Sequence, residues 1–233
     1  MQIQHRDFTH SAPLRAALKR GLARQAMDHA AAAPADPARV MEACARSGTS
    51  PTAEGRLVRR LQSQPGLVSI RRGAQGLVLV LRSPADVLTR SAGTDVFTET
   101  ALLYTRLTMI PSRRGTTFQV SRASFCRHAV ERFVERGTAP LDGPVLPRLD
   151  AEAVALLSHL RRATPLTDAG DEFVPSAATG LWAGSIDRSA PDPAWPVVWT
   201  ADAPPVPTFS ARTFLGPDQM RPTVWLAWSR LQS

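Results

Sequence analysis

The chain has 233 residues, 43% of them hydrophobic, and carries 28 basic and 20 acidic side chains for a formal net charge of +8. This composition is typical of a globular protein with one large or two small domains, and no run of about eighteen apolar residues predicts a membrane-spanning helix. The first residues lack the apolar core of a secretory signal, and Cys44 and Cys126 form neither a disulfide framework nor a metal-ligand spacing. We therefore expect a cytoplasmic protein without a metal or a cofactor.

The basic charge is unevenly distributed along the chain. Lys19 is the one lysine, and the other 27 basic residues are arginines. Residues 1–140 hold 21 basic and 10 acidic side chains, whereas residues 141–233 hold 7 and 10. A GC-rich genome explains the preference for arginine but not this asymmetry. Guanidinium groups donate paired hydrogen bonds to phosphate. The excess of positive charge therefore predicts that the N-terminal part binds a polyanion or, alternatively, an acidic protein.

The first 63 residues predict three helices. One begins after Ser11, a second begins at Pro37 and ends near Gly48, and a third spans residues 51–63. A polar cap followed by proline marks a helix start, because proline lacks only an amide that would be unpaired there. Apolar runs at 67–70 and 77–81 then predict a β-hairpin with a basic turn that includes Arg71 and Arg72.

Helices followed by a hairpin with a basic tip are the element order of a winged helix. A short polar turn joins the second and third predicted helices, as in a helix-turn-helix unit. The third helix would then be the recognition helix, with Arg56, Arg59 and Arg60 contacting phosphates or base edges, and Arg71 and Arg72 in the wing. Small helical bundles with a following hairpin also occur in proteins that bind nothing, so both interpretations stay open.

The middle of the chain predicts a second hairpin and an amphipathic helix. Residues 83–93 favour a short helix or loop. Alternating polar and apolar residues predict strands at 101–110 and 116–120, joined by a turn that offers Arg113 and Arg114 to a polyanion. The helix is expected over residues 121–136.

The last third predicts a helix followed by short strands. A proline-rich loop at 139–147 precedes the helix at 150–162. All five tryptophans follow it: we expect Trp182 and Trp199 in the core of a sheet, although either could stack on bases, and Trp225 and Trp228 packed inward. The strands are expected at 172–175, 179–186, 197–200 and 208–215, and a closing helix at 222–231.

One polar face of the amphipathic helix carries the most specific combination of side chains. His128, Arg132 and Arg136 stand in successive turns, opposite the apolar stripe. An imidazole beside two guanidiniums can supply the acid or base and the phosphate-binding cations that metal-independent RNA cleavage requires. The alternative is a solvated helix face with i,i+4 ion pairs such as Arg127 with Glu131.

The helix contains the pattern Arg-His-Ala-x-x-Arg-x-x-x-Arg-Gly over residues 127–137. Together with the strands that follow, residues 121–216 resemble the small bacterial toxin-like domains of the barnase–EndoU–colicin–RelE group. The resemblance implies a helix next to a compact antiparallel sheet and metal-independent endoribonuclease activity. It implies His128 as acid or base, the two following arginines as ligands of the scissile phosphate, and Thr213 as a hydroxyl from a late strand. The chain departs from the group in its second helix, its length and the lack of a lysine on any strand.

The sequence as a whole predicts an α+β protein. Residues 1–93 form a basic helical part with a β-hairpin, winged-helix-like, and residues 94–233 form an antiparallel sheet covered by helices. The expected function is a toxin-type endoribonuclease acting on RNA, with catalysis itself left open. The alternatives are a non-catalytic nucleic-acid-binding regulator or phage-related protein, and an adaptor whose arginine surface binds an acidic protein.

Overall fold

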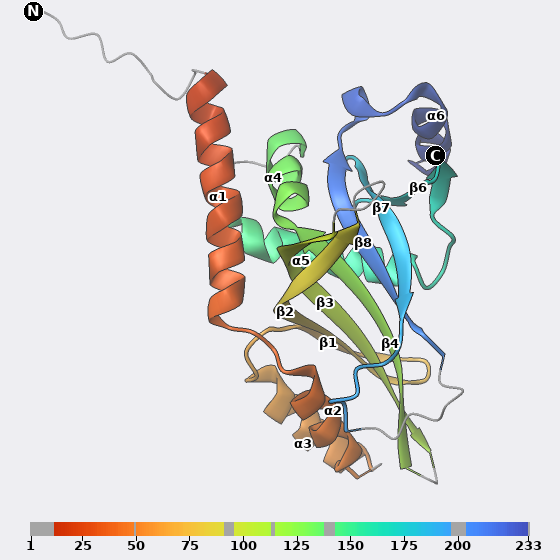
Figure 1. The fold of residues 1–233 in the computed structure, drawn as a ribbon. Helices are drawn as coiled ribbons and strands as arrows, with labels where there is room; N and C mark the ends of the chain where they lie inside the picture. The colour runs from red at the N-terminus through yellow and green to blue at the C-terminus, as the bar shows by residue number, and fades with distance from the viewer. Residues whose placement is uncertain are drawn as a thin grey trace, which may run out of the picture.

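The computed structural model describes residues 12–48, 50–90, 96–112, 115–137, 143–196 and 204–232, and within them the chain forms one eight-stranded sheet (Figure 1). The strands follow the order β1-β2-β3-β4-β8-β7-β6-β5. Neighbouring strands are antiparallel except β4 and β8, which run parallel and join two four-stranded meanders. The strand bounds are β1 Leu67–Gly73, β2 Gly76–Arg90, β3 Val96–Ser112, β4 Gly115–Cys126, β5 Leu166–Asp168, β6 Asp171–Pro175, β7 Leu181–Ser189 and β8 Val206–Leu215.

Helices cover both faces of this sheet. α1, α4 and α5 pack on one face around Tyr104, Phe125 and Trp182, whereas α2 and α3 pack on the other face around Leu79 and Leu107. Figure 1 shows α1 beside α4 along one side of the sheet, α2 with α3 at one end, and α6 at the other end. The bounds are α1 Ala12–Ala32, α2 Pro37–Ala45, α3 Pro51–Gln62, α4 Arg127–Arg136, α5 Val145–His159, the short 3-10 helix η2 Pro217–Gln219 and α6 Pro222–Gln232.

The α+β class, the three N-terminal helices and the closing helix are confirmed. Asp36 accepts a hydrogen bond from the amide of Arg39 at 3.1 Å, and Ser50 accepts one from the amide of Ala53 at 3.2 Å. These caps satisfy amides that have no partner inside α2 and α3. None of the helices in the described ranges combines the length and the apolar character that crossing a bilayer requires.

Two strands are longer than the sequence predicted. β2 continues to Arg90, so the helix or loop expected from residue 83 is wrong as far as residue 90. β4 continues to Cys126, so α4 begins at Arg127 and not at Ser121. In both cases ladder hydrogen bonds with β3 outweigh the local preference, since Leu102 pairs with a residue of each neighbouring strand. Cys126 then caps α4, and its Sγ accepts a hydrogen bond from the amide of Ala129 at 3.4 Å.

The β1-β2 hairpin does not stand apart as a wing. β2 pairs with β3 from Leu77 to Arg90, so the described sheet runs across the boundary expected between residues 93 and 94. The hairpin turn is shorter than predicted, because Arg71 and Arg72 belong to β1. The sheet is mixed and not purely antiparallel, because β4 and β8 run parallel. The helical N-terminal part and the C-terminal strands therefore share one framework.

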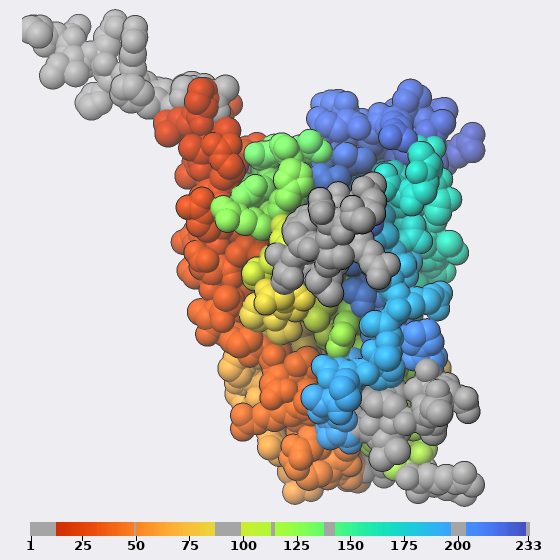
Figure 2. Space-filling model, viewed as in Figure 1, coloured from red at the N-terminus to blue at the C-terminus, as the bar shows by residue number. Residues whose placement is uncertain are grey.

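The tryptophans that the structure describes are buried, with one exception. Trp182 is fully buried in the main core, as predicted, and Trp228 packs inward from α6. Trp225 is 44% exposed, so its predicted inward packing is wrong. Trp195 is buried in the apolar cluster that includes residues of α2 and α3, and Figure 2 shows the light-blue segment after β7 lying over the orange α2. Trp199 lies outside the described residues.

The carboxylate of Glu152 fixes α5 to the turn between β6 and β7. Glu152 is only 4% exposed. Four donors surround it and replace the water that a buried carboxylate loses. They are Ser176 Oγ at 2.7 Å, Ala177 N at 3.1 Å, Ala178 N at 2.8 Å and Trp182 Nε1 at 3.0 Å.

A second acidic residue fixes α5 to the other half of the sheet. Asp150 accepts a hydrogen bond from Tyr104 OH at 2.8 Å and forms an ion pair with Arg82 Nη1 at 2.5 Å. Burial, followed by the nearby Asp150 carboxylate, raises the pKa of Tyr104 well above its usual range. α5 is thus held by both meanders, and its position across the sheet is fixed.

Replacing Glu152 tests this anchoring. Glu152→Ala removes the acceptor of Ser176 Oγ, Trp182 Nε1 and the Ala177 amide in the interior, whereas the Ala178 amide keeps Ser176 Oγ at 3.0 Å, so the free energy of unfolding is expected to fall by about 3 kcal/mol or more. Glu42→Ala is the matched control, because the Glu42 side chain is 47% exposed and forms an i,i+4 ion pair with Arg46, and its loss is expected to cost about 0.5 kcal/mol. Urea unfolding followed by tryptophan fluorescence measures both. Equal losses in the two variants would contradict the anchoring role.

Candidate functional site

The end of α5 leaves part of one sheet face uncovered. Side chains two apart on a strand share a face, so Arg106 and Thr108 follow Tyr104 on the face of β3 that α5 covers. The register places Ser121 and Gln119 of β4 opposite them. α5 ends at His159, and beyond its end this polar stretch of the sheet faces open space.

Two adjoining cavities of about 320 and 370 Å³ lie there. Both are lined by Arg106, Thr108 and Arg161. We call their common surface the arginine groove and define it by its cations, which are Arg71, Arg106, Arg161, Arg162 and Arg188. None of the described residues that line it is Asp or Glu.

Arg106 forms the floor of the groove. The residue is 6% exposed, and its guanidinium makes no hydrogen bond or ion pair with any residue in the described ranges. Its neighbours in the ladder are Val80 and Ser121, neither of which carries a charge. Burial, followed by the positive charges of Arg161 and Arg71, lowers the pKa of Arg106 to about 10. The group is still charged at neutral pH, so the floor of the groove holds a largely buried cation that has no counter-charge among the described residues.

A buried charge without a partner is costly, and an anion would offset that cost. The remaining cations of the groove are exposed at its rim and come from different elements. Arg161 Nη2 donates to Gln75 Oε1 of the β1-β2 turn at 3.4 Å, and Arg162 Nε donates to the carbonyl of Ser158 at 3.2 Å. The arrangement can bind one anion at the floor and further anions along the rim.

The smaller cavity also has an apolar wall. Leu160, Ile186, Pro207 and Phe209 line it beside Arg106 and Arg188. The wall comes from β7, β8 and the residue that follows α5. The groove therefore offers an apolar surface and guanidinium groups next to one another.

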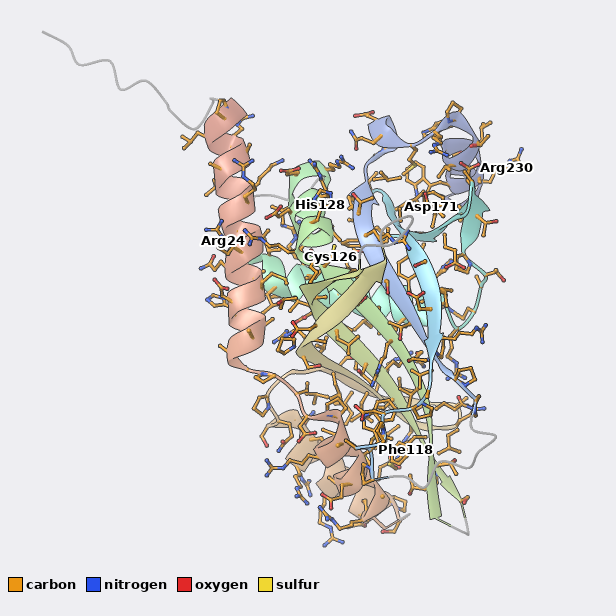
Figure 3. All side chains as sticks on the ribbon, in the orientation of Figure 1. Arg24, Phe118, Cys126, His128, Asp171 and Arg230 are labelled. Carbon is orange, nitrogen blue, oxygen red and sulfur yellow. The ribbon has the colours of Figure 1, made fainter. Side chains whose placement is uncertain are left out.

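The predicted catalytic residues lie elsewhere, on α4. His128 is exposed on this helix, a short way beyond Cys126 (Figure 3). Arg132 Nε lies 3.4 Å from His128 Nε2, and its Nη1 forms an ion pair with Glu135 Oε2 at 2.6 Å. Arg136 Nη1 donates to the carbonyl of Phe214 at 2.8 Å, which ties α4 to β8. The structure thus brings His128 and Arg132 together, whereas Arg136 is used in the contact between α4 and β8.

Thr213 does not join this group. It pairs with Ala183 and shares that residue's face of the sheet, whereas Phe214 and Trp182 occupy the face that α4 covers. The ladder between β7 and β8 skips Arg212, which is a β-bulge. The bulge leaves Arg212 on the side of Thr213, where its Nη2 donates to Ser185 Oγ at 3.0 Å. The predicted placement of Thr213 beside His128 is therefore wrong.

The predicted nucleic-acid contacts fall into separate places. Arg56, Arg59 and Arg60 are exposed on α3, which packs on the sheet face opposite the arginine groove. Arg72 is engaged by Glu54, with 2.6 Å between Nη2 and Oε1. Of the predicted residues that the structure describes, only Arg71 lines the groove. Arg113 and Arg114 lie outside the described residues.

Sequence reasoning missed Arg106, Arg161, Arg162 and Arg188. A signal for Arg106 was present, because it is the one charged residue among residues 101–112 of an apolar strand. Its significance depends on α5 ending before it, which no local pattern indicates. The described residues contain no group of three or more His, Cys, Asp or Glu side chains placed to hold a metal ion.

Comparison of the chain with protein-family models, with curated proteins and with solved structures found no match.

An uncharged substitution at the floor tests whether Arg106 serves binding or stability. Arg106→Met removes a buried cation and keeps most of the side-chain volume, so the free energy of unfolding is expected to stay the same or to rise by up to about 2 kcal/mol. The exposed Arg188→Met is the control and is expected to change it by less than about 0.5 kcal/mol. Urea unfolding at low salt measures both. A clear loss of stability in Arg106→Met would mean that Arg106 holds the fold together.

Proposed function

We propose that this protein binds nucleic acid through its phosphates in the arginine groove, without cleaving it. The observation that carries the proposal is the largely buried guanidinium of Arg106, which has no counter-charge among the described residues and lines two cavities with further arginines at their rims. A ligand with several phosphates spaced along a chain matches cations that are spread over adjoining cavities.

The arginines of the groove fit both a phosphate and the carboxylates of an acidic protein, so the choice between the two depends on the apolar wall. All cations of the groove are arginines, whose planar forks donate two parallel hydrogen bonds to a phosphate. A carboxylate accepts the same fork, so the charge alone does not decide. The apolar wall beside Arg106 favours nucleic acid, because a nucleotide carries an aromatic base close to its phosphate whereas Asp and Glu side chains carry nothing apolar beyond their short stems.

Binding of labelled oligonucleotides tests the proposal. Arg106→Gln is expected to weaken binding of a fluorescein-labelled RNA or DNA oligonucleotide at least tenfold, because it removes the desolvated cation. Arg59→Gln is the matched control, since Arg59 is exposed on α3 on the opposite face of the sheet, and is expected to bind like the parent. Fluorescence anisotropy measures both affinities.

The salt dependence of the same measurement reports the number of phosphates bound. With four phosphates held in the groove, the logarithm of the affinity of a single strand should fall with the logarithm of salt concentration with a slope of about −3. A slope near zero, or equal weakening by Arg106→Gln and Arg59→Gln, would contradict binding in the groove.

Endoribonuclease activity stays a prediction, supported by the exposed His128 next to Arg132. The non-catalytic proposal expects labelled RNA to stay intact during incubation with the protein at neutral pH, and His128→Ala to bind RNA with unchanged affinity. Denaturing gel electrophoresis of the RNA measures cleavage. RNA fragments that disappear with His128→Ala would overturn the non-catalytic proposal in favour of the endoribonuclease.

A further inference from the structure

We infer that the arginine groove takes a single strand and seats one base against the apolar wall beside Arg106. This inference rests on the proposed function and adds the form of the nucleic acid to it. The apolar wall is the observation behind it, because phosphate contacts alone give no reason for an open cavity lined by Leu160, Ile186 and Pro207. A base exposes two flat apolar surfaces, and proteins that hold an unpaired base cover these surfaces with aromatic or apolar side chains.

The size of the cavity separates single strands from duplexes. Its volume of about 320 Å³ is at the lower end of the range for pockets that enclose small molecules, which is enough for a base with its sugar. In a duplex the bases are stacked inside and the phosphates lie on the outside. A duplex would therefore meet the exposed Arg71, Arg161 and Arg188 at the rim, whereas Arg106, which is 6% exposed, lies below their level.

The cations and the apolar wall lie close enough together for one nucleotide to contact both. Arg106 and Arg188 line the same cavity as the apolar wall, so a phosphate on a guanidinium leaves its own base within reach of Ile186 and Pro207. Polar side chains face the cavity from the neighbouring strands: Ser121 lies opposite Arg106 in the ladder, and Gln119 lies opposite Thr108. These groups can donate or accept hydrogen bonds at the edge of the base or at a 2′-hydroxyl.

Four labelled probes of equal length test the inference by fluorescence anisotropy. They are a single-stranded RNA, the corresponding single-stranded DNA, the RNA duplex, and a single strand in which abasic sites replace the bases. The two single strands that carry bases are expected to bind at least tenfold more tightly than the duplex. The abasic strand keeps its phosphates but loses the base, so it is expected to bind about tenfold more weakly than the RNA with the same salt slope. Tighter binding of RNA than of DNA would indicate that Ser121 and Gln119 contact the 2′-hydroxyl. Equal binding of the two would indicate that they contact the base.

A cavity-filling variant provides the matched protein control. Ser121→Phe is expected to reduce affinity for the RNA to that of the abasic strand and to leave the abasic strand unaffected, because it occupies the space of the base and retains Arg106. Ile186→Ser, which makes the wall polar, is expected to act in the same direction and serves if Ser121→Phe does not fold. Circular dichroism and thermal unfolding verify that each variant is folded.

The outcomes distinguish failure of the inference from failure of the proposed function. If duplex, abasic and normal strands bind equally and all depend on Arg106, the base pocket is refuted and phosphate binding stands. If none of the four probes binds, the proposed function itself is refuted. If poly-glutamate displaces the RNA at equal charge concentration, the groove selects acidic chains in general and the inference falls.

Discussion

The buried carboxylate of Glu152 determines where α5 lies, and with it which part of the sheet stays open. Four donors surround this group, among them Ser176 Oγ and Trp182 Nε1, so a shift of α5 along the sheet would leave several buried polar groups unpaired at once. With α5 held there, the helix ends at His159 and Arg161 follows at the edge of the uncovered sheet face. The arginine groove is thus a consequence of how one helix is anchored.

Burying the charge of Arg106 costs free energy at the groove, and favourable contacts in the surrounding sheet offset this cost. Arg106 stands in the centre of the sheet, desolvated and close to the charges of Arg71 and Arg161. Residues that violate the usual rules of burial and charge pairing concentrate at functional sites, where the rest of the fold compensates for them. Here β2 and β4, which flank Arg106 by continuous ladder pairing, and the apolar clusters on both sheet faces supply that compensation.

Much of the fold follows from local patterns, whereas the site depends on long-range contacts. A polar cap residue followed by proline correctly predicted the start of α2 and of α3. The alternation of polar and apolar residues over 101–110 correctly predicted part of β3. Ser121 was assigned to a helix because the amphipathic pattern that follows it was extended too far, and only pairing with β3 places it in β4. Thr213 was taken from the family resemblance, and a single bulged residue, Arg212, reverses the alternation of β8 and turns Thr213 away from the face that α4 covers. The groove unites arginines from both charge-distinct parts of the chain, so charge counting along the sequence could not locate it.

The most direct test of the central claim is the ¹⁵Nε–¹Hε spectrum of the arginine side chains during titration with a short single-stranded oligonucleotide. We expect the signal of Arg106, assigned by its loss in Arg106→Gln, to shift and saturate with the ligand, because its guanidinium gains an anion that the described residues do not supply. An Arg106 signal that stays unchanged while those of Arg56, Arg59 and Arg60 shift would contradict the account and place the nucleic acid on α3.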